Sequence, residues 1–412
     1  MGEYYGLLLS AVLGAMLMAS SNHLLMAFMS LELLSIASYV LVGYFKGDRK
    51  SSEAALKYII YGSVAAGVMG FGLSLFYGLT GTGDLAALGK VLESVAPDAN
   101  LAQLRVTVAL ALILTLAGLA YKMATIPMHF WCPDVYEGAP TCITAFLSVT
   151  SKAAGFALTI RFLEALKIVD PLASRVDWRV IMIVISLFTM TLGNLAALWQ
   201  DNLKRMLAYS SIAHAGYMLM GTVVLRGGQY SGAGLIAYYL LAYLAMNLGA
   251  FAVVILMENR LGSVDISAYT GLGRRAPFLA VALTIFLFSL IGIPPTAGFG
   301  GKYLLFQGVL EAGKNGGGWP YYFLAVAAVV NTAISVYYYA RIIKNMYLTG
   351  EPATAEAAAG GNGRSYFEGE PARLSVPLLG TVLVAFFLFL TFYLFFRLGD
   401  VSKATFNLKI FS

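Results

Sequence analysis

Apolar stretches of about 20 residues, the length that crosses the hydrocarbon core of a bilayer as a helix, recur along the whole chain between short polar loops. This pattern predicts eleven membrane-spanning segments and therefore an all-α polytopic membrane protein. The predicted segments are 4–20, 24–45, 54–79, 106–130, 142–164, 179–200, 203–225, 232–257, 277–311, 320–346 and 375–397.

Two of these segments contain helix breakers. In 106–130 an apolar run reaches Lys122 and then meets Pro127. In 277–311 the string SLIGIPPTAGFGGKYLLF places Pro294 and Pro295 before Lys302. Proline removes a backbone donor and clashes with the preceding turn, so both helices are predicted to break within the membrane. A simpler interpretation, in which the prolines only kink their helices, stays open.

Broken helices in corresponding places of two halves are typical of inverted repeats around a site near mid-membrane. The broken segments are the fourth and the ninth, so each repeat would contain five helices, an odd number that inverts the topology. The chain then divides into a first repeat over 1–178, a second over 179–346, a flexible low-complexity loop over 347–374, and a C-terminal helix and tail over 375–412.

Five ionisable residues lie inside otherwise apolar segments: Glu32, Lys57, Lys122, Lys152 and Lys302. A charge in hydrocarbon is costly, so it usually faces the bundle interior and marks an ion path. Glu32 has no charge near it in the sequence. We expect it to be protonated or paired with a cation on another helix, and Lys122 is the candidate partner. The alternative for this pair is a salt bridge with a structural role only.

Lys152 lies in the middle of its helix, where burial favours the neutral amine and allows proton release, as a relay requires. Lys57 lies nearer a helix end and could instead snorkel to water. His214, inside the segment that begins near Leu203, titrates close to physiological pH and can pass a proton between lysines. A hydrogen-bonded core histidine is the alternative there.

Composition excludes several classes of function. The chain is 59% hydrophobic and 12% charged, and its net charge of +6 is scattered over short loops without the basic patch of a nucleic-acid-binding surface. Two cysteines, Cys132 and Cys142, are too few for an iron–sulfur cluster or a cysteine zinc site. Neither a GxGxxG nor a GxxxxGK[ST] motif is present. We therefore predict no cofactor and no metal in this chain.

Charge in the loops also predicts an orientation. Alternate loops carry twelve basic residues on the side where the chain begins and eleven on the other. By the positive-inside rule this small excess favours a cytoplasmic N-terminus and an external C-terminus. The first segment lacks the basic region and small-residue cleavage site of a secretory signal, so we expect it to stay as a helix.

Three strings carry a resemblance to a known family. They are YKMATIPMHFWCPDVYEGAPTCITAFLSVTSKAAGFALTIRF from Tyr121 to Phe162, WQDNLKRMLAYSSIAHAGYMLMG from Trp199 to Gly221, and GIPPTAGFGGKYLLF ending at Phe306. Together they resemble the antiporter-like N subunit of complex I, the proton-pumping NADH:quinone oxidoreductase. PDVYEGAPT is the most specific part, and the resemblance covers nearly the whole chain.

The resemblance implies roles for individual residues. Glu32 matches the glutamate of the family and Lys122 its partner lysine on the broken helix. Lys152 matches the central bridging lysine, and Lys302 the lysine of the second broken helix. These residues form a polar axis at mid-membrane in the family, and quinone reduction elsewhere in the complex drives protons along it. Lys57 and His214 lie in family-like segments without an assigned role.

The resemblance also implies partners and a location. NADH or ferredoxin, FMN, iron–sulfur clusters and quinone are expected only in other subunits. The expected partners are neighbouring antiporter-like and small K-type membrane subunits, in an energy-transducing membrane such as the bacterial inner membrane. Bacterial members typically have fourteen helices, and this chain matches without the first three, as animal mitochondrial versions do. A misplaced start codon is one explanation, and altered lateral contacts are the expected consequence.

Three other functions stay open at this point. An Mrp-type cation/proton antiporter subunit, and a membrane-arm subunit of a hydrogenase- or ferredoxin-linked complex, would use the same fold. A membrane scaffold with inactive channels would tolerate apolar replacements of the buried charges.

Overall fold

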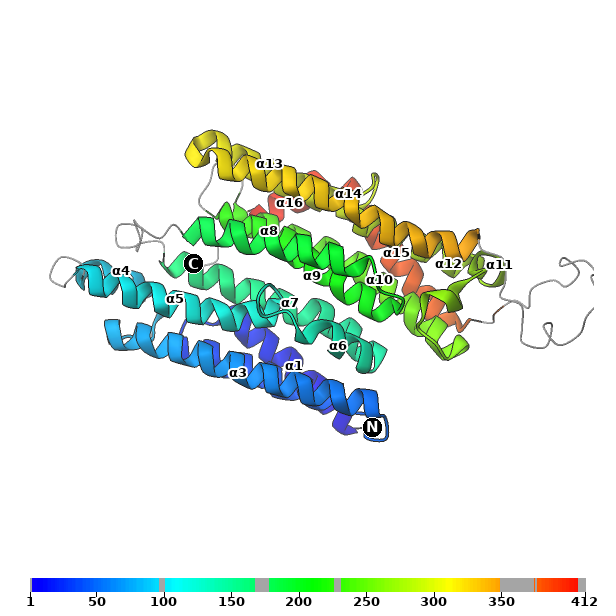
Figure 1. Cartoon of the computed structure of the whole chain (residues 1–412), viewed down its shortest axis with the longest axis horizontal. Helices are drawn as coiled ribbons and strands as arrows, with labels where there is room; N and C mark the ends of the chain where they lie inside the picture. Colours follow the sequence, from blue (N-terminus) through cyan, green and yellow to red (C-terminus); the bar gives the residue numbers. More distant parts are fainter. Residues whose placement is uncertain are drawn as a thin grey trace, which may run out of the picture.

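The computed structural model describes residues 2–95, 101–166, 178–225, 231–348, 374 and 376–406. Within these ranges the chain forms a bundle of helices, most of which run roughly side by side, and no β-sheet (Figure 1). The prediction of an all-α membrane protein is confirmed.

The helices follow one another in this order: α1 (Gly2–Ser20), α2 (Leu24–Val42), α3 (Arg49–Thr80), α4 (Leu85–Val95), α5 (Leu101–Met123), α6 (Trp131–Gly138), α7 (Thr141–Ala165), α8 (Trp178–Ala197), α9 (Leu203–Val223), α10 (Gly232–Leu261), η2 (Ile266–Tyr269), α11 (Leu272–Arg275), α12 (Pro277–Ile291), α13 (Ala297–Ala312), η3 (Gly313–Gly317), α14 (Trp319–Tyr347), α15 (Leu378–Phe396) and α16 (Leu398–Phe406).

Nine helices of the described ranges are long and apolar enough to cross a membrane alone. The two predicted segments outside this set are α9 and the pair formed by α12 and α13. Helix α9 buries every residue except Arg205 and Tyr209, so protein surrounds it and its sequence needs less apolar character. Among helices of eight residues or more, α4, α6 and α16 lie outside the predicted segments, and each is too short to span a membrane.

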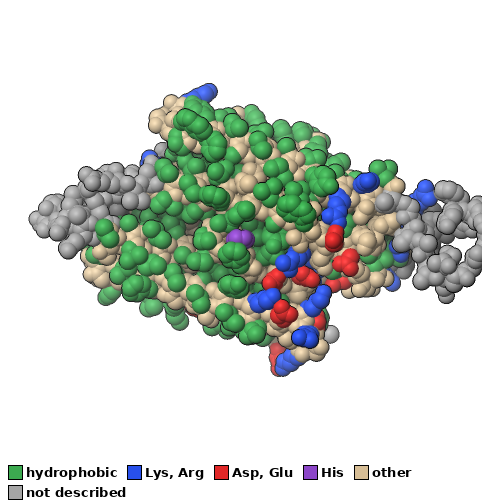
Figure 2. Space-filling view, viewed as in Figure 1, with side chains coloured by type: hydrophobic (Ala, Val, Ile, Leu, Met, Phe, Trp, Pro, Cys, Tyr) green, Lys and Arg blue, Asp and Glu red, His purple; other side chains and the backbone are tan. Residues whose placement is uncertain are grey.

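The bundle has two ends, which we call proximal and distal. The chain begins at the proximal end, where the loops 43–48, 139–140, 198–202 and 262–276 also lie, at the right of Figure 1. The loops 21–23, 81–84 and η3 lie at the distal end. Figure 2 shows a broad belt of hydrophobic side chains, with charged side chains gathered toward the proximal end, as expected for a bundle that sits in lipid.

The two interrupted helices are each divided in two. Helix α5 ends at Met123 and α6 begins at Trp131, with Pro127 in the segment between them. Helix α12 ends at Ile291 and α13 begins at Ala297, with Pro294 and Pro295 between. Gly292 ends α12 at φ +92°, a left-handed conformation that favours glycine because a Cβ would be strained there.

The proposed division into repeats stays a prediction. Its boundary at 178/179 coincides with the start of α8, and each half contains one interrupted helix. The flexible loop predicted over 347–374 falls almost entirely outside the described residues.

Candidate functional site

Lys122 lies in the last turn of α5, immediately before the first interruption, and is fully buried. Its Nζ donates a hydrogen bond to Ser35 Oγ at 2.9 Å. Ser35 lies on α2, one turn after Glu32. The charges of Glu32 and Lys122 interact electrostatically, but in the described part of the chain they form no direct ion pair. Ser35 therefore contacts the lysine from the helix that carries the glutamate.

Glu32 is only partly buried, and one of its oxygens has no partner. Its Oε1 is enclosed by protein and accepts no hydrogen bond from any described residue. A buried acceptor without a donor is unfavourable, so a water or a proton on the carboxyl group is required there. The predicted pairing of Glu32 with Lys122 stays a prediction, and the described hydrogen bond between Lys122 and α2 is the one to Ser35.

Lys152 is buried in the middle of α7. Its Nζ donates to the carbonyl oxygen of Met123 at 3.3 Å and to that of Ser211 at 2.9 Å. Met123 ends α5, and Ser211 lies on α9. Lys152 therefore joins the end of α5, at the first interruption, to α9.

His214 lies one turn after Ser211 on α9, and both Lys152 and Lys302 act on it electrostatically. Its Nδ1 is hydrogen-bonded to Tyr239 Oη at 2.8 Å. The imidazole is buried. On α9 it lies one turn from Ser211, which binds Lys152, and one turn from Tyr217, whose ring lies against Lys302. A proton relay between the two lysines would require such a position.

Lys302 is buried on α13, one turn after the second interruption. Its Nζ donates to the carbonyl oxygens of Leu290 at 3.2 Å and Ile291 at 2.8 Å. The ammonium group also lies 4.5 Å from the centroid of the Tyr217 ring. These contacts place it against the end of α12.

The two interruptions are held in the same way. Helix ends leave backbone carbonyls without intrahelical donors, and these carbonyls carry partial negative charge. At the end of α5 the carbonyl of Met123 is bound by Lys152, and at the end of α12 those of Leu290 and Ile291 are bound by Lys302. In each case a buried amine supplies donors that the broken helix lacks.

Lys57 belongs to a different arrangement. Its Nζ forms ion pairs with Asp134 and Glu53, both at 2.8 Å, and its side chain is 38% exposed. Asp134 lies on α6 and also pairs with Arg205 of α9 at 2.6 Å. Together with Lys50 and Glu137 these side chains form a charged cluster around a polar cavity of about 190 Å³. In the described part of the chain, the hydrogen bonds and ion pairs of Lys57 do not connect it to Lys122, Lys152 or Lys302.

Sequence reasoning missed one buried lysine and several polar contacts. Lys204 was counted among the loop charges, but it is 4% exposed and donates to the carbonyl oxygen of Ala139 at 2.7 Å. It ties the start of α9 to the end of α6. Lys204 is the second residue of α9, and a lysine at a helix start is usually exposed, so its burial could not be predicted from the sequence. Ser35 and Tyr239 gave no usable signal, because serine and tyrosine are common in membrane helices.

The described residues contain no group of three or more His, Cys, Asp or Glu side chains placed to hold a metal ion. The candidate site is the set of ionisable groups between α2 and α13, namely Glu32, Lys122, Lys152, His214 and Lys302. Side chains of these kinds can bind and release protons.

Comparison with known proteins identifies the family of this chain. A profile for the family described as NADH:quinone oxidoreductase/Mrp antiporter, TM, matches residues 21–335. NADH-quinone oxidoreductase subunit N 2 of Chloroherpeton thalassium is 47% identical over 396 residues, which cover 95% of this chain and 71% of the relative. The chain belongs to the subunit N family of the NADH-quinone oxidoreductases.

Two further comparisons agree with membership of the subunit N family. Subunit N of an Anaeromyxobacter species is 51% identical over 368 residues, covering 86% of this chain and 70% of that protein. Among solved structures, a chain of respiratory complex I from Thermus thermophilus is 34% identical with a TM-score of 0.75, and the match covers 98% of this chain and 80% of that one. The resemblance inferred from the sequence strings is confirmed.

Proposed function

We propose that this chain is a proton-translocating subunit of the membrane arm of an NADH:quinone oxidoreductase. It contributes no redox chemistry itself, and NADH or ferredoxin, FMN, iron–sulfur clusters and quinone belong to other subunits. Its neighbours are other membrane-arm subunits. The observation that supports this function best is the line of three buried lysines, two of which bind the carbonyls freed at helix interruptions.

The route runs from Glu32 and Lys122 through Lys152 and His214 to Lys302. Glu32 favours the charged form of Lys122, because opposite charges attract strongly at low dielectric. A change that disturbs this pair favours release of the Lys122 proton toward Lys152. Waters bridge the groups, since the described side chains make no continuous set of direct contacts between the amines.

His214 serves the second half of this route. Both lysines act on its imidazole, which can accept a proton from one side and return it to the other. The Tyr239 hydroxyl holds its Nδ1, so the ring keeps one orientation while Nε2 exchanges protons. The charged cluster of Lys57, Asp134 and Arg205 lies beside this line and positions α6.

The proximal end faces the cytoplasm in this proposal, and the distal end faces the outside. The small excess of basic residues at the proximal loops supports this orientation. Fusing a reporter that is active on only one side of the membrane to the C-terminus tests it. A reporter active in the cytoplasm would contradict the orientation while leaving the proton route untouched.

The decisive experiment uses the intact complex in proteoliposomes. Glu32→Gln and Lys122→Met should each greatly reduce the number of protons moved per electron, and the complex should still assemble. Lys314→Met is a matched control, because Lys314 is exposed at the distal end and should pump normally. Normal proton-to-electron stoichiometry in both Glu32→Gln and Lys122→Met would remove the case for this route.

The matched family profile also includes Mrp antiporters, so the transported ion needs its own test. Vesicles with the intact complex should acidify at the same rate with and without Na⁺. Na⁺-dependent exchange in the absence of an electron donor would favour a cation/proton antiporter subunit instead. Purification with hydrogenase or ferredoxin-reactive subunits would identify a different electron donor.

A further inference from the structure

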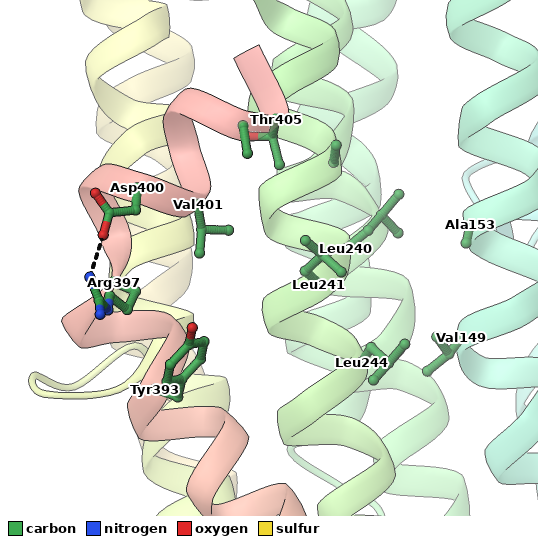
Figure 3. Close-up of a pocket in the computed structure, with 12 residues that line it drawn as sticks. Val149, Ala153, Leu240, Leu241, Leu244, Tyr393, Arg397, Asp400, Val401 and Thr405 are labelled. Carbon is green, nitrogen blue, oxygen red and sulfur yellow. Dashed lines mark hydrogen bonds and ion pairs between the residues drawn. The ribbon is translucent and has the colours of Figure 1, made fainter. Parts of the chain in front are cut away.

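An apolar groove of about 720 Å³ lies between α7, α10 and the C-terminal helices α15 and α16 (Figure 3). Its lining comprises Val149, Ala153, Ala237, Leu240, Leu241, Leu244, Tyr393, Arg397, Asp400, Val401, Ala404 and Thr405. Most of these side chains are aliphatic. Such a surface suits acyl chains or an apolar helix, and alone it would indicate contact with lipid.

One ion pair sets this groove apart from an ordinary lipid-facing surface. Arg397 Nη1 donates to Asp400 Oδ2 at 2.7 Å, and the two side chains are 60% and 65% exposed. A guanidinium group carries five N–H donors. Among the described residues, Asp400 is the one side chain that accepts a hydrogen bond from Arg397. The remaining donors of Arg397 point away from any partner in the described part of the chain.

The pair lies near the middle of the bundle's length, level with residues of α7 and α10. In Figure 3, Arg397 stands at a height between Leu241 and Leu244, which lie in the central part of α10. Across the groove stand Val149 and Ala153, and Ala153 follows the buried Lys152 directly on α7. Helix α15 thus brings a charged pair to the depth of the candidate proton route, on the outside of the bundle.

Charges at this depth are costly when they face lipid. Acyl chains offer no hydrogen-bond acceptors, and an arginine near the centre of a membrane usually faces protein or a water-filled cavity. A phospholipid could fill the apolar part of the groove, but its phosphate lies at the membrane surface. The occupant that satisfies Arg397 must therefore carry a polar group well below the headgroups.

We propose that this groove is the docking site of a membrane-spanning helix of a neighbouring subunit. This helix presents aliphatic side chains to Leu240 and Leu244. At the level of Arg397 it presents a hydrogen-bond acceptor, such as a carboxylate, an amide or a hydroxyl. The inference rests on the proposed place of the chain in a membrane arm and not on the proton route through it.

Site-specific photocrosslinking in the intact complex tests the docking site. Leu241 lines the groove and is 42% exposed, so a benzoylphenylalanine there should form an adduct with another subunit. Val326 on α14 is 62% exposed and does not line the groove, so the same probe at that position is the control. Mass spectrometry of the adduct identifies the partner segment and should find a polar residue in it.

Substitution of the ion pair tests the polar contact. Arg397→Gln should lower the yield of the Leu241 adduct about tenfold, the equivalent of about 1.4 kcal/mol. Arg397→Lys should retain part of the yield, because it keeps the charge. Lys403→Gln is the matched control, since Lys403 is an exposed cation of α16 outside the groove lining.

Several outcomes would overturn this docking site. They are adducts with lipid only, adducts within the same polypeptide, no adduct at Leu241, or an unchanged yield in Arg397→Gln. Proton pumping is not the readout, so these results leave the proposed function standing. Conversely, a failed pumping experiment would leave the crosslinks unaffected.

Discussion

Lys152 Nζ donates a hydrogen bond to the carbonyl oxygen of Met123 across 3.3 Å. Beside it, Ser151 Oγ donates to the carbonyl oxygen of Lys122 at 3.2 Å. Two consecutive residues of α7 therefore hold the last two residues of α5. The central lysine is connected to the helix that carries Lys122 through the backbone, without contact between the two amines.

Lys152→Arg separates the structural role of this lysine from proton transfer. Arginine keeps the donors that bind Met123 and Ser211, but it does not release its proton under physiological conditions. We expect the complex to assemble and to reduce quinone, while proton translocation falls close to background. Pumping by Lys152→Arg at the wild-type rate would show that Lys152 only holds the helix end.

Lys302→Met should impair both stability and pumping. The substitution leaves the carbonyls of Leu290 and Ile291 without their buried donor, and each unsatisfied group costs about 1–3 kcal/mol. Thermal unfolding of the purified complex should therefore begin at a lower temperature than in the exposed control Lys314→Met. Equal unfolding temperatures for the two variants would mean that water replaces the amine at no cost.

Asp134→Asn should affect the position of α6. The carboxylate pairs with Lys57 of α3 and Arg205 of α9, and the substitution leaves both cations without this partner. Glu53→Gln is the milder comparison, because among the described residues Glu53 forms an ion pair with Lys57 alone and is 59% exposed. We expect a cysteine introduced in α6 to react faster with a thiol reagent in Asp134→Asn than in Glu53→Gln. The double variant Asp134→Asn with Arg205→Gln should recover part of the protection.

Two glycines of α3 give a matched test of helix packing. A Cβ on Gly72 would lie 2.7 Å from the backbone nitrogen of Thr115 and 2.9 Å from the carbonyl oxygen of Ala111, both on α5. Gly72→Ala should therefore push α3 from α5 and destabilise the subunit by roughly 1–3 kcal/mol. Gly67 has nothing within 4 Å of its added Cβ, so Gly67→Ala should be neutral or stabilising. Equal unfolding temperatures would contradict this close approach of the two helices.

The sequence could predict the membrane spans because apolar length is a local property. Each predicted span corresponds to one helix, except 277–311, which covers both α12 and α13. Pro127, Pro294 and Pro295 lie just after the ends of α5 and α12. Lys122, Lys152 and Lys302 stood out because a charge within an apolar run is visible without a structure. Burial of all three agrees with that interpretation.

Contacts between helices could not be predicted in the same way. Nothing in the sequence indicated that Lys152 binds carbonyl groups, since every residue has one and only the fold shows which are free. The sequence places Lys57 inside a membrane segment, yet Asp134, 77 residues away, provides one of its ion pairs. From the sequence, Arg397 is the last residue of the final predicted span. Only the structure shows that it lines one groove with Val149 and Ala153 of α7.

The strength of the contact between Lys302 and the end of α12 depends on the protonation of the lysine. A neutral amine donates weaker hydrogen bonds than an ammonium group. Deprotonation of Lys302 therefore weakens its hydrogen bonds to the carbonyl oxygens of Leu290 and Ile291. Lys152 stands in the same relation to the end of α5. A displacement of α5 or α12 by a neighbouring subunit would therefore change how readily Lys152 or Lys302 releases its proton.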